Sequence, residues 1–304
     1  MKKLINFILF VVISYLLLKS DLFSGLNEEL LFSYNPFQVC AILFSCFLAQ
    51  YLMYIRWLRF LRKLGVEARH ELIRMWHHRS ILIGYFIFGF VTSDVLRVYN
   101  ARSSQGAGDI GARLLFSSQA TILDRLFSLA SLVVVASLAI PIAWSAIGST
   151  SAGIILLSGL IFSVMCLYQG VKYFKSRNKD VYILNLIKLI KDLINNRENT
   201  IFLLTQFFIS LSANITMGFA FFIICKSEYS LMPYSISVLS LSNLTAIIPL
   251  TPAGLGFAEG LSEYLLTAKG LLLGAEAVFI LRVVNLLVTL TYWLLAIFSM
   301  EKNI

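Results

Sequence analysis

Long apolar runs recur along the chain, and they restrict its fold more than any other feature of the sequence. Each contains at most two charged side chains, and they cover residues 37–58, 114–141, 152–173, 201–224 and 279–298. A helix of about 20 apolar residues is long enough to cross the hydrocarbon core of a bilayer. Only 13% of all residues are charged, compared with roughly 25% in soluble domains. The sequence therefore predicts an all-α, polytopic integral membrane protein built as a helix bundle.

The chain offers no hydrophilic stretch long enough for a separate soluble domain, so we expect one transmembrane domain over residues 1–304. Residues 4–18 follow Lys2 and Lys3 but lack a small-x-small cleavage site, and we interpret them as a retained first span. Residues 37–175 and 200–300 form two candidate half-repeats with inverted topology. Between them, residues 176–199 have the spacing of an amphipathic helix, which would lie on the membrane surface or cap the bundle in solvent.

Positive charge predicts the orientation of the chain. Two basic stretches, residues 56–79 and 172–197, each hold seven lysines and arginines, and such stretches belong in the cytoplasm. The N-terminus is then also cytoplasmic, and the location that fits is a bacterial-type cytoplasmic membrane. An even number of crossings must separate the two stretches, so residues 80–96 are expected to be re-entrant and to return through residues 100–113. In the second half, residues 234–248 are expected to return inward to the broken stretch described below.

Prolines and glycines interrupt the C-terminal apolar region over residues 249–263. Proline removes a backbone donor and glycine permits conformations closed to other residues. Irregular backbone at membrane depth persists only where it is buried in protein or faces a wet cavity. We therefore predict a broken helix that carries two carboxylates, Glu259 and Glu263. Its hinge residues are Pro249, Pro252, Gly254, Gly256 and Gly260, although Gly256 and Gly260 could instead allow close helix packing.

Ionisable side chains inside apolar runs are the other candidates for a site, because each is costly in lipid. Asp94 and Arg97 share a helix face, with Thr92 and Ser93 as a candidate N-cap. Further candidates are Asp124 with Arg125, Glu276, and Arg282 with Asn285 three residues later. Two interpretations stay open. The groups are internal ion pairs that hold helices in register, or the arginines and helix N-termini converge on an anionic head group.

Several of these residues occur in short motifs that resemble one family. Residues 54–57, 93–99 and 122–126, with the later Pro249-x-x-Pro252-x-Gly254-Leu255-Gly256-x-x-Glu259-Gly260 and Arg282, are similar to the lysylphosphatidylglycerol synthase transmembrane, or flippase-like, family. The resemblance implies a lipid flippase without the soluble aminoacyl-transferase domain of some members. The chain departs from the family pattern at residues 89–93, and Ala258 stands where the family often has an arginine. A different head group would account for these departures.

The leading hypothesis is therefore a transporter that moves an anionic phospholipid or lipid-linked head group between leaflets. One alternative is a membrane-embedded glycosyltransferase or lipid-modifying transferase, with Asp94 or Glu259 as the base. Another is a scaffold that recruits a soluble synthase through its basic stretches. Membrane lipids are the expected partners, homo-oligomers stay open, and no cofactor, metal or nucleic acid is expected. Residues 106–111 match GxGxxG without a preceding strand, and the adjacent His77 and His78 point to different helix faces.

Overall fold

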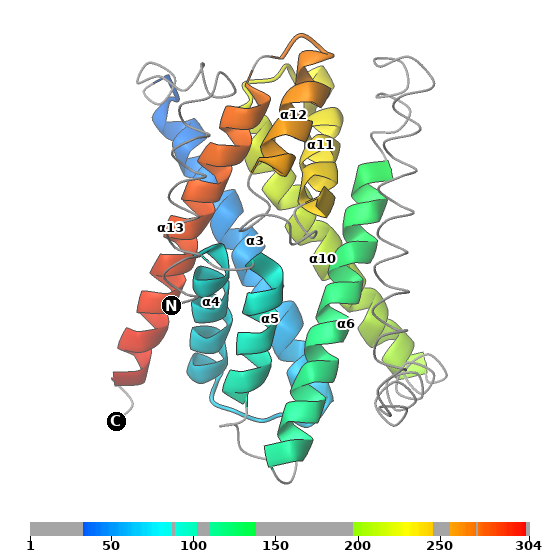
Figure 1. Cartoon of the computed structure of the whole chain (residues 1–304), viewed down its shortest axis with the longest axis vertical. Helices are drawn as coiled ribbons and strands as arrows, with labels where there is room; N and C mark the ends of the chain where they lie inside the picture. The colour runs from blue at the N-terminus through cyan, green and yellow to red at the C-terminus, as the bar shows by residue number, and fades with distance from the viewer. Residues whose placement is uncertain are drawn as a thin grey trace.

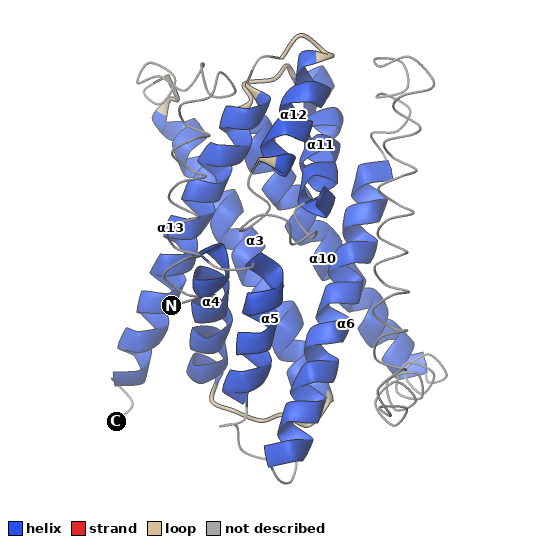
Figure 2. Ribbon diagram, in the orientation of Figure 1, coloured by secondary structure: helices blue, strands red, loops and turns tan. Residues whose placement is uncertain are grey.

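The computed structural model describes residues 33–86, 89–101, 110–137, 197–245, 256–271 and 273–301. Within these ranges every regular element is a helix (Figure 2), which confirms the predicted all-α fold. The predictions for residues 4–18 and 152–173, for most of the amphipathic linker, and for Pro249, Pro252 and Gly254 concern parts of the chain outside these ranges.

Four described helices are long and apolar enough to cross a membrane. They are α3 (Pro36–Lys63), α6 (Ile110–Ser137), α10 (Arg197–Ile224) and α13 (Gly274–Glu301), and they run along the long axis of the molecule (Figure 1). Large apolar side chains stand exposed on their outer faces, such as Phe44, Phe208 and Phe298 at 67%, 59% and 59%. An apolar exterior of this kind fits contact with lipid chains.

Local sequence signals explain the ends of α3. Asn35 caps its first turn by accepting the backbone N–H of Gln38 at 2.8 Å, and the side chain of Gln38 accepts the N–H of Asn35 at 3.0 Å. At the other end Gly65 has a φ of 78°, a left-handed conformation that glycine adopts without steric cost. The N–H of Val66 reaches back to the Leu61 carbonyl at 3.0 Å and closes the helix.

Two shorter helices form a hairpin between α3 and α6. Helix α4 (His70–Phe86) packs against α5 (Gly89–Asn100), and both lie in the lower half of Figure 1. The re-entrant element expected at residues 80–96 is thus longer, and its return limb is α5 instead of residues 100–113. Thr92 and Ser93 lie inside α5, so the prediction that they cap a helix is wrong. Hydropathy missed these boundaries because the charged residues of α5 interrupt its apolar pattern.

A second short pair follows α10. After the turn η3 (Tyr229–Leu231), helices α11 (Met232–Thr245) and α12 (Phe257–Thr267) run antiparallel. The Tyr234 hydroxyl, near the start of α11, donates to the Leu265 carbonyl, near the end of α12, at 2.6 Å. Helix α11 thus covers most of residues 234–248, which were expected to return inward to the broken stretch. Helix α11 has 14 residues and spans about 21 Å, less than the roughly 30 Å of a hydrocarbon core.

The contacts of the two halves correspond. Helix α4 of the first short pair packs on α13, and α11 of the second pair packs on α6. The pairs α4–α5 and α11–α12 lie at opposite ends of the molecule (Figure 1). An inverted repeat predicts this arrangement, and the assignment of two half-repeats stays a prediction.

Two glycines near the α12–α13 contact give a matched test of packing. A Cβ on Gly274 would lie 2.6 Å from the Ser262 carbonyl oxygen and 2.7 Å from the backbone of Glu263, whereas one on Gly260 meets no described atom within 4 Å. We expect Gly274→Ala to destabilise the protein by about 1–3 kcal/mol. Gly260→Ala should be neutral or stabilising by roughly 0.5–1 kcal/mol. Thermal unfolding in detergent measures both, and equal losses would contradict this account.

Among the described residues, therefore, Gly260 does not mediate helix packing, and the close approach occurs at Gly274. The described surroundings of Gly260 thus give no support to the alternative of a Gly256-x-x-x-Gly260 packing motif. Gly256 has a different role, because its φ of 90° lies in the region that favours glycine and it begins α12.

Candidate functional site

A cavity of about 360 Å³ lies at the centre of the bundle, between the two halves. All four long helices contribute to its wall, as do α4, α5 and α11 of the two short pairs, whereas α12 does not, and much of the wall is apolar. Its charged lining residues are Arg56, Asp94, Arg97, Asp124, Arg125 and Arg282. Five of these six were candidates from the sequence, and the fold brings all six together from α3, α5, α6 and α13.

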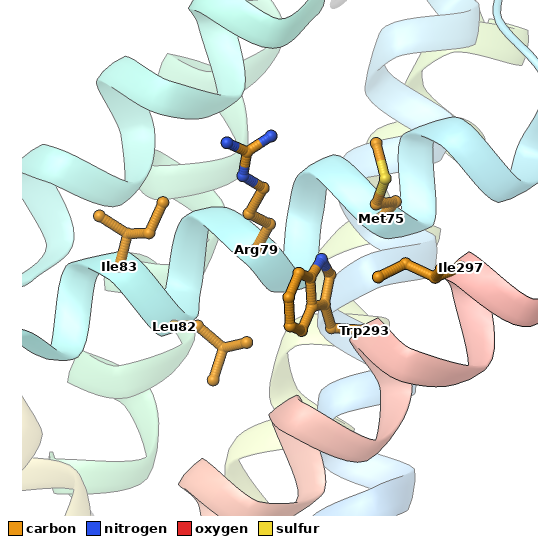
Figure 3. A pocket seen from close by; sticks show the side chains of 6 residues that line it. All are labelled: Met75, Arg79, Leu82, Ile83, Trp293 and Ile297. Carbon is orange, nitrogen blue, oxygen red and sulfur yellow. The ribbon is translucent and has the colours of Figure 1, made fainter.

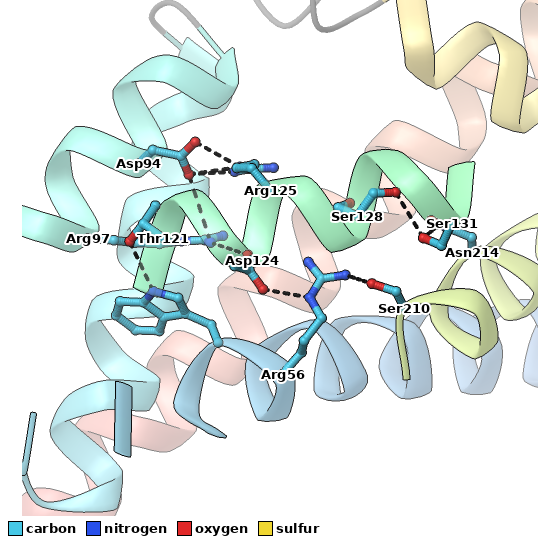
Figure 4. A network of polar contacts seen from close by, with 11 residues as sticks. Arg56, Asp94, Arg97, Thr121, Asp124, Arg125, Ser128, Ser131, Ser210 and Asn214 are labelled. Atoms are coloured by element: carbon cyan, nitrogen blue, oxygen red, sulfur yellow. Dashed lines mark hydrogen bonds and ion pairs between the residues drawn. The ribbon is translucent and has the colours of Figure 1, made fainter. Parts of the chain in front are cut away.

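Asp94 and Arg125 form the most extensive ion pair of the cavity. Arg125 Nε lies 3.0 and 2.7 Å from the two Asp94 carboxylate oxygens, and Nη2 lies 2.6 Å from Oδ1 (Figure 4). This two-point geometry fixes both planar groups and joins α5 to α6. Asp94 also lies 3.9 Å from Nη1 of Arg97, so the predicted shared helix face is present, but Arg125 is the nearer partner.

Asp124 pairs with arginines from two other helices. Its Oδ1 accepts from Arg56 Nε at 2.6 Å, and its Oδ2 accepts from Arg97 Nη1 at 3.3 Å (Figure 4). Arg56 also donates to the Ser210 hydroxyl on α10. These three charged side chains are only 2–4% exposed. The network therefore joins α3, α5, α6 and α10 in the interior.

The sequence grouped Asp124 with Arg125, and the structure does not pair them. Neighbours in a helix point about 100° apart, because the helix has 3.6 residues per turn. Asp124 consequently faces α3, whereas Arg125 faces Asp94 on α5. Both residues form ion pairs between helices, with partners other than each other.

Sequence reasoning missed Arg56, which it assigned to a cytoplasmic basic stretch. Arg56 is 3% exposed and holds Asp124. Its neighbours Tyr54 and Trp57 are fully buried, and the Arg97 guanidinium carbon lies 5.5 Å from the centroid of the Trp57 ring. The missed signal was that Arg56 falls inside the apolar run 37–58, where a charge is costly unless it is paired.

The second half contributes Arg282 and its partner Glu259. Arg282 Nε lies 3.2 Å from Glu259 Oε1, and the other carboxylate oxygen accepts the Gly256 N–H at 2.9 Å. Glu259 is fully buried while Arg282 is 18% exposed. Glu259 therefore stabilises the start of α12 and also orients an arginine on the cavity wall. Asn285, one turn after Arg282, lines the cavity and lies 3.5 Å from Gln50.

The structure does not bring Glu263 or Glu276 to the cavity. The Glu263 carboxylate accepts the Ala275 N–H at 3.0 Å and the Thr267 hydroxyl at 3.0 Å, so it stabilises the first turn of α13. Glu276 is 2% exposed in that same turn. Glu263 was expected to bind substrate beside Glu259, but the structure places neither carboxylate in the cavity lining, because the two side chains of α12 have other partners.

Positive charge exceeds negative charge at the site. Four guanidinium groups, of Arg56, Arg97, Arg125 and Arg282, face three carboxylates, of Asp94, Asp124 and Glu259. Within the described residues, no group of three or more His, Cys, Asp or Glu is placed to hold a metal ion. Chemically, the cavity is suited to an anion that carries an apolar part.

Four membrane-length helices, two short antiparallel pairs and a charged internal cavity define the class as a helical, membrane-type bundle with a buried polar site. Comparisons with protein families, with curated proteins and with solved structures found no match.

Proposed function

We propose that the protein is a membrane transporter that binds an anionic phospholipid or lipid-linked head group in the central cavity and moves it between leaflets. The observation that carries the proposal is the convergence of four arginines from both halves on one cavity. Ionisable groups at membrane depth mark substrate pathways in many membrane proteins. Sites between inverted halves, beside broken helices, are typical of transporters.

The arginines differ in their exposure and therefore in their proposed roles. Arg125 and Arg282 are 26% and 18% exposed, whereas Arg56 and Arg97 are 3% and 4% exposed. Guanidinium groups bind phosphate with two parallel hydrogen bonds. Arg125 and Arg282 would contact the phosphate, and Arg56 with Arg97 would keep Asp124 and the first-half helices in place.

The apolar part of the cavity supports a lipid substrate over a free anion. Leu129, Leu132 and Leu281 line the same space as the charged groups. A phosphate that enters with its glycerol and the first carbons of its acyl chains would bring matching apolar surface. The family resemblance of the motifs around Asp94, Asp124 and Glu259 is compatible with this substrate class.

The transferase alternative has less support from the geometry. A general base needs a carboxylate that can reach the substrate, yet Asp94 and Glu259 each lie within 3.2 Å of a guanidinium nitrogen. Each carboxylate therefore already accepts from an arginine, which leaves it less available to accept a proton from a substrate. A scaffold that recruits a soluble synthase would not need a charged internal cavity, so this alternative explains fewer of the observations.

Native mass spectrometry of gently solubilised protein tests the proposal. We expect the wild type to retain one anionic or polyprenyl-linked lipid above its bulk abundance, and Arg282→Ala to lose it. Arg69→Ala is the matched control, because Arg69 is half exposed outside the cavity and pairs only at 3.9 Å with Glu71. If all three proteins carry bulk lipid in equal amounts, Arg282 is structural and the proposal fails.

A further inference from the structure

A second candidate site lies on the outer surface, in a groove between α4 and α13. The groove has a volume of about 410 Å³ and is lined by Met75, Arg79, Leu82, Ile83, Trp293 and Ile297 (Figure 3). The residues of α4 recur at helical spacing on one face, and Trp293 and Ile297 are one turn apart on α13. The groove therefore runs along two packed helices, and its lining is apolar except for one charged side chain.

That charge, Arg79, has no hydrogen bond or ion pair with any described residue, and its side chain is exposed. The indole N–H of Trp293 is buried and also lacks an acceptor among the described residues. Both groups only donate hydrogen bonds. The Trp293 N–H is covered by protein atoms, so the exposed Arg79 guanidinium is the donor that the groove offers to a ligand with acceptor oxygens and apolar chains.

The groove lies toward one end of the membrane-length helix α13. Arg74, next to the groove residue Met75 on α4, donates to the Ser299 hydroxyl near the end of α13 at 2.8 Å. Tryptophan side chains concentrate where the ends of membrane helices meet the lipid head groups. Arginine can lay its stem along apolar surface while its charged end reaches the head groups.

We propose that this groove binds a glycerophospholipid with an anionic head group. Arg79 binds the head-group phosphate, and an acyl chain lies along Leu82, Ile83 and Ile297. The lipid stays bound on the outside of the bundle, and its site is separate from the central cavity. Neither Arg79 nor Trp293 lines that cavity, so this site does not depend on the proposed transport function.

Quenching of Trp293 by brominated lipids tests the proposal, because bromine quenches tryptophan only near contact. The protein is reconstituted in vesicles that mix brominated phosphatidylglycerol or phosphatidylcholine with unbrominated lipid. The chain has four tryptophans, and subtracting the signal of Trp293→Phe isolates Trp293. We expect phosphatidylglycerol to be preferred about fivefold, the size of one arginine–anionic lipid interaction. Arg79→Gln should reduce the preference to about one.

Arg69→Gln removes an equal charge outside the groove and should keep the fivefold preference. If Arg79→Gln also keeps it, or if both lipids quench equally in the wild type, the proposal is wrong. If no brominated lipid quenches Trp293, protein covers the groove, as in contact with a second copy, and the proposal is also wrong. Trp293→Tyr serves if the phenylalanine variant does not fold. Arg282→Ala should leave this preference unchanged, which separates the site from the central cavity.

Discussion

Replacing Asp124 by alanine should destabilise the protein by about 3–5 kcal/mol, the usual loss when one partner of a buried ion pair is removed. Asp124 is the common acceptor for Arg56 and Arg97, and all three side chains are at most 4% exposed. The variant would leave two guanidinium groups in the interior, with only Asp94 still near Arg97, at 3.9 Å. Thermal or denaturant unfolding in detergent measures the loss.

Two carboxylate variants calibrate this result. Glu67→Ala removes an exposed acid, and such surface changes usually stay within about 0.5 kcal/mol. Asp94→Ala should fall between the two, because Asp94 and Arg125 are 23% and 26% exposed and solvent screens their interaction. If Asp124→Ala were no more destabilising than Glu67→Ala, the buried network would not hold the first-half helices together.

Replacing Arg282 by glutamine should slow lipid movement about 10- to 100-fold, if the central cavity transports lipid as proposed. A hydrogen bond to a charged group contributes roughly 1.5–3 kcal/mol, and Arg282 is the second-half arginine on the cavity wall. Dithionite reduction of fluorescent phosphatidylglycerol in proteoliposomes measures the rate. Arg282→Lys should lose less, because it keeps the charge but not the two-point geometry.

Arg69→Gln serves again as the charge-matched control and should transport at the wild-type rate. Glu259→Gln should also slow transport, because the carboxylate that orients Arg282 at 3.2 Å is lost. Each variant must first elute as a folded protein. If folded Arg282→Gln moves lipid as fast as the wild type, Arg282 serves only as the counter-ion of Glu259, and the scaffold alternative becomes the better explanation.

Sequence reasoning located most of the candidate site but not its connections. Asp94, Arg97, Asp124, Arg125 and Arg282 stood out because charges are rare in apolar runs, and all five line one cavity. Arg56 obeyed the same rule but was hidden by the basic residues that follow it. Sequence proximity also grouped Glu263 with Glu259, although the Glu263 carboxylate accepts a hydrogen bond from Ala275 in the first turn of α13.

The sequence by itself determined the all-α class, the membrane-length helices and the residue types at the site, because hydropathy and the cost of buried charge act locally along the chain. Only the tertiary structure decided that α4 and α5 form a hairpin, that α11 turns back into α12, and which aspartate pairs with which arginine. Those choices depend on contacts between residues far apart in the chain, for example Arg56 with Asp124 and Ser210. Helical periodicity specifies which face of a helix is polar, but the packing of neighbouring helices selects the partner that the face meets.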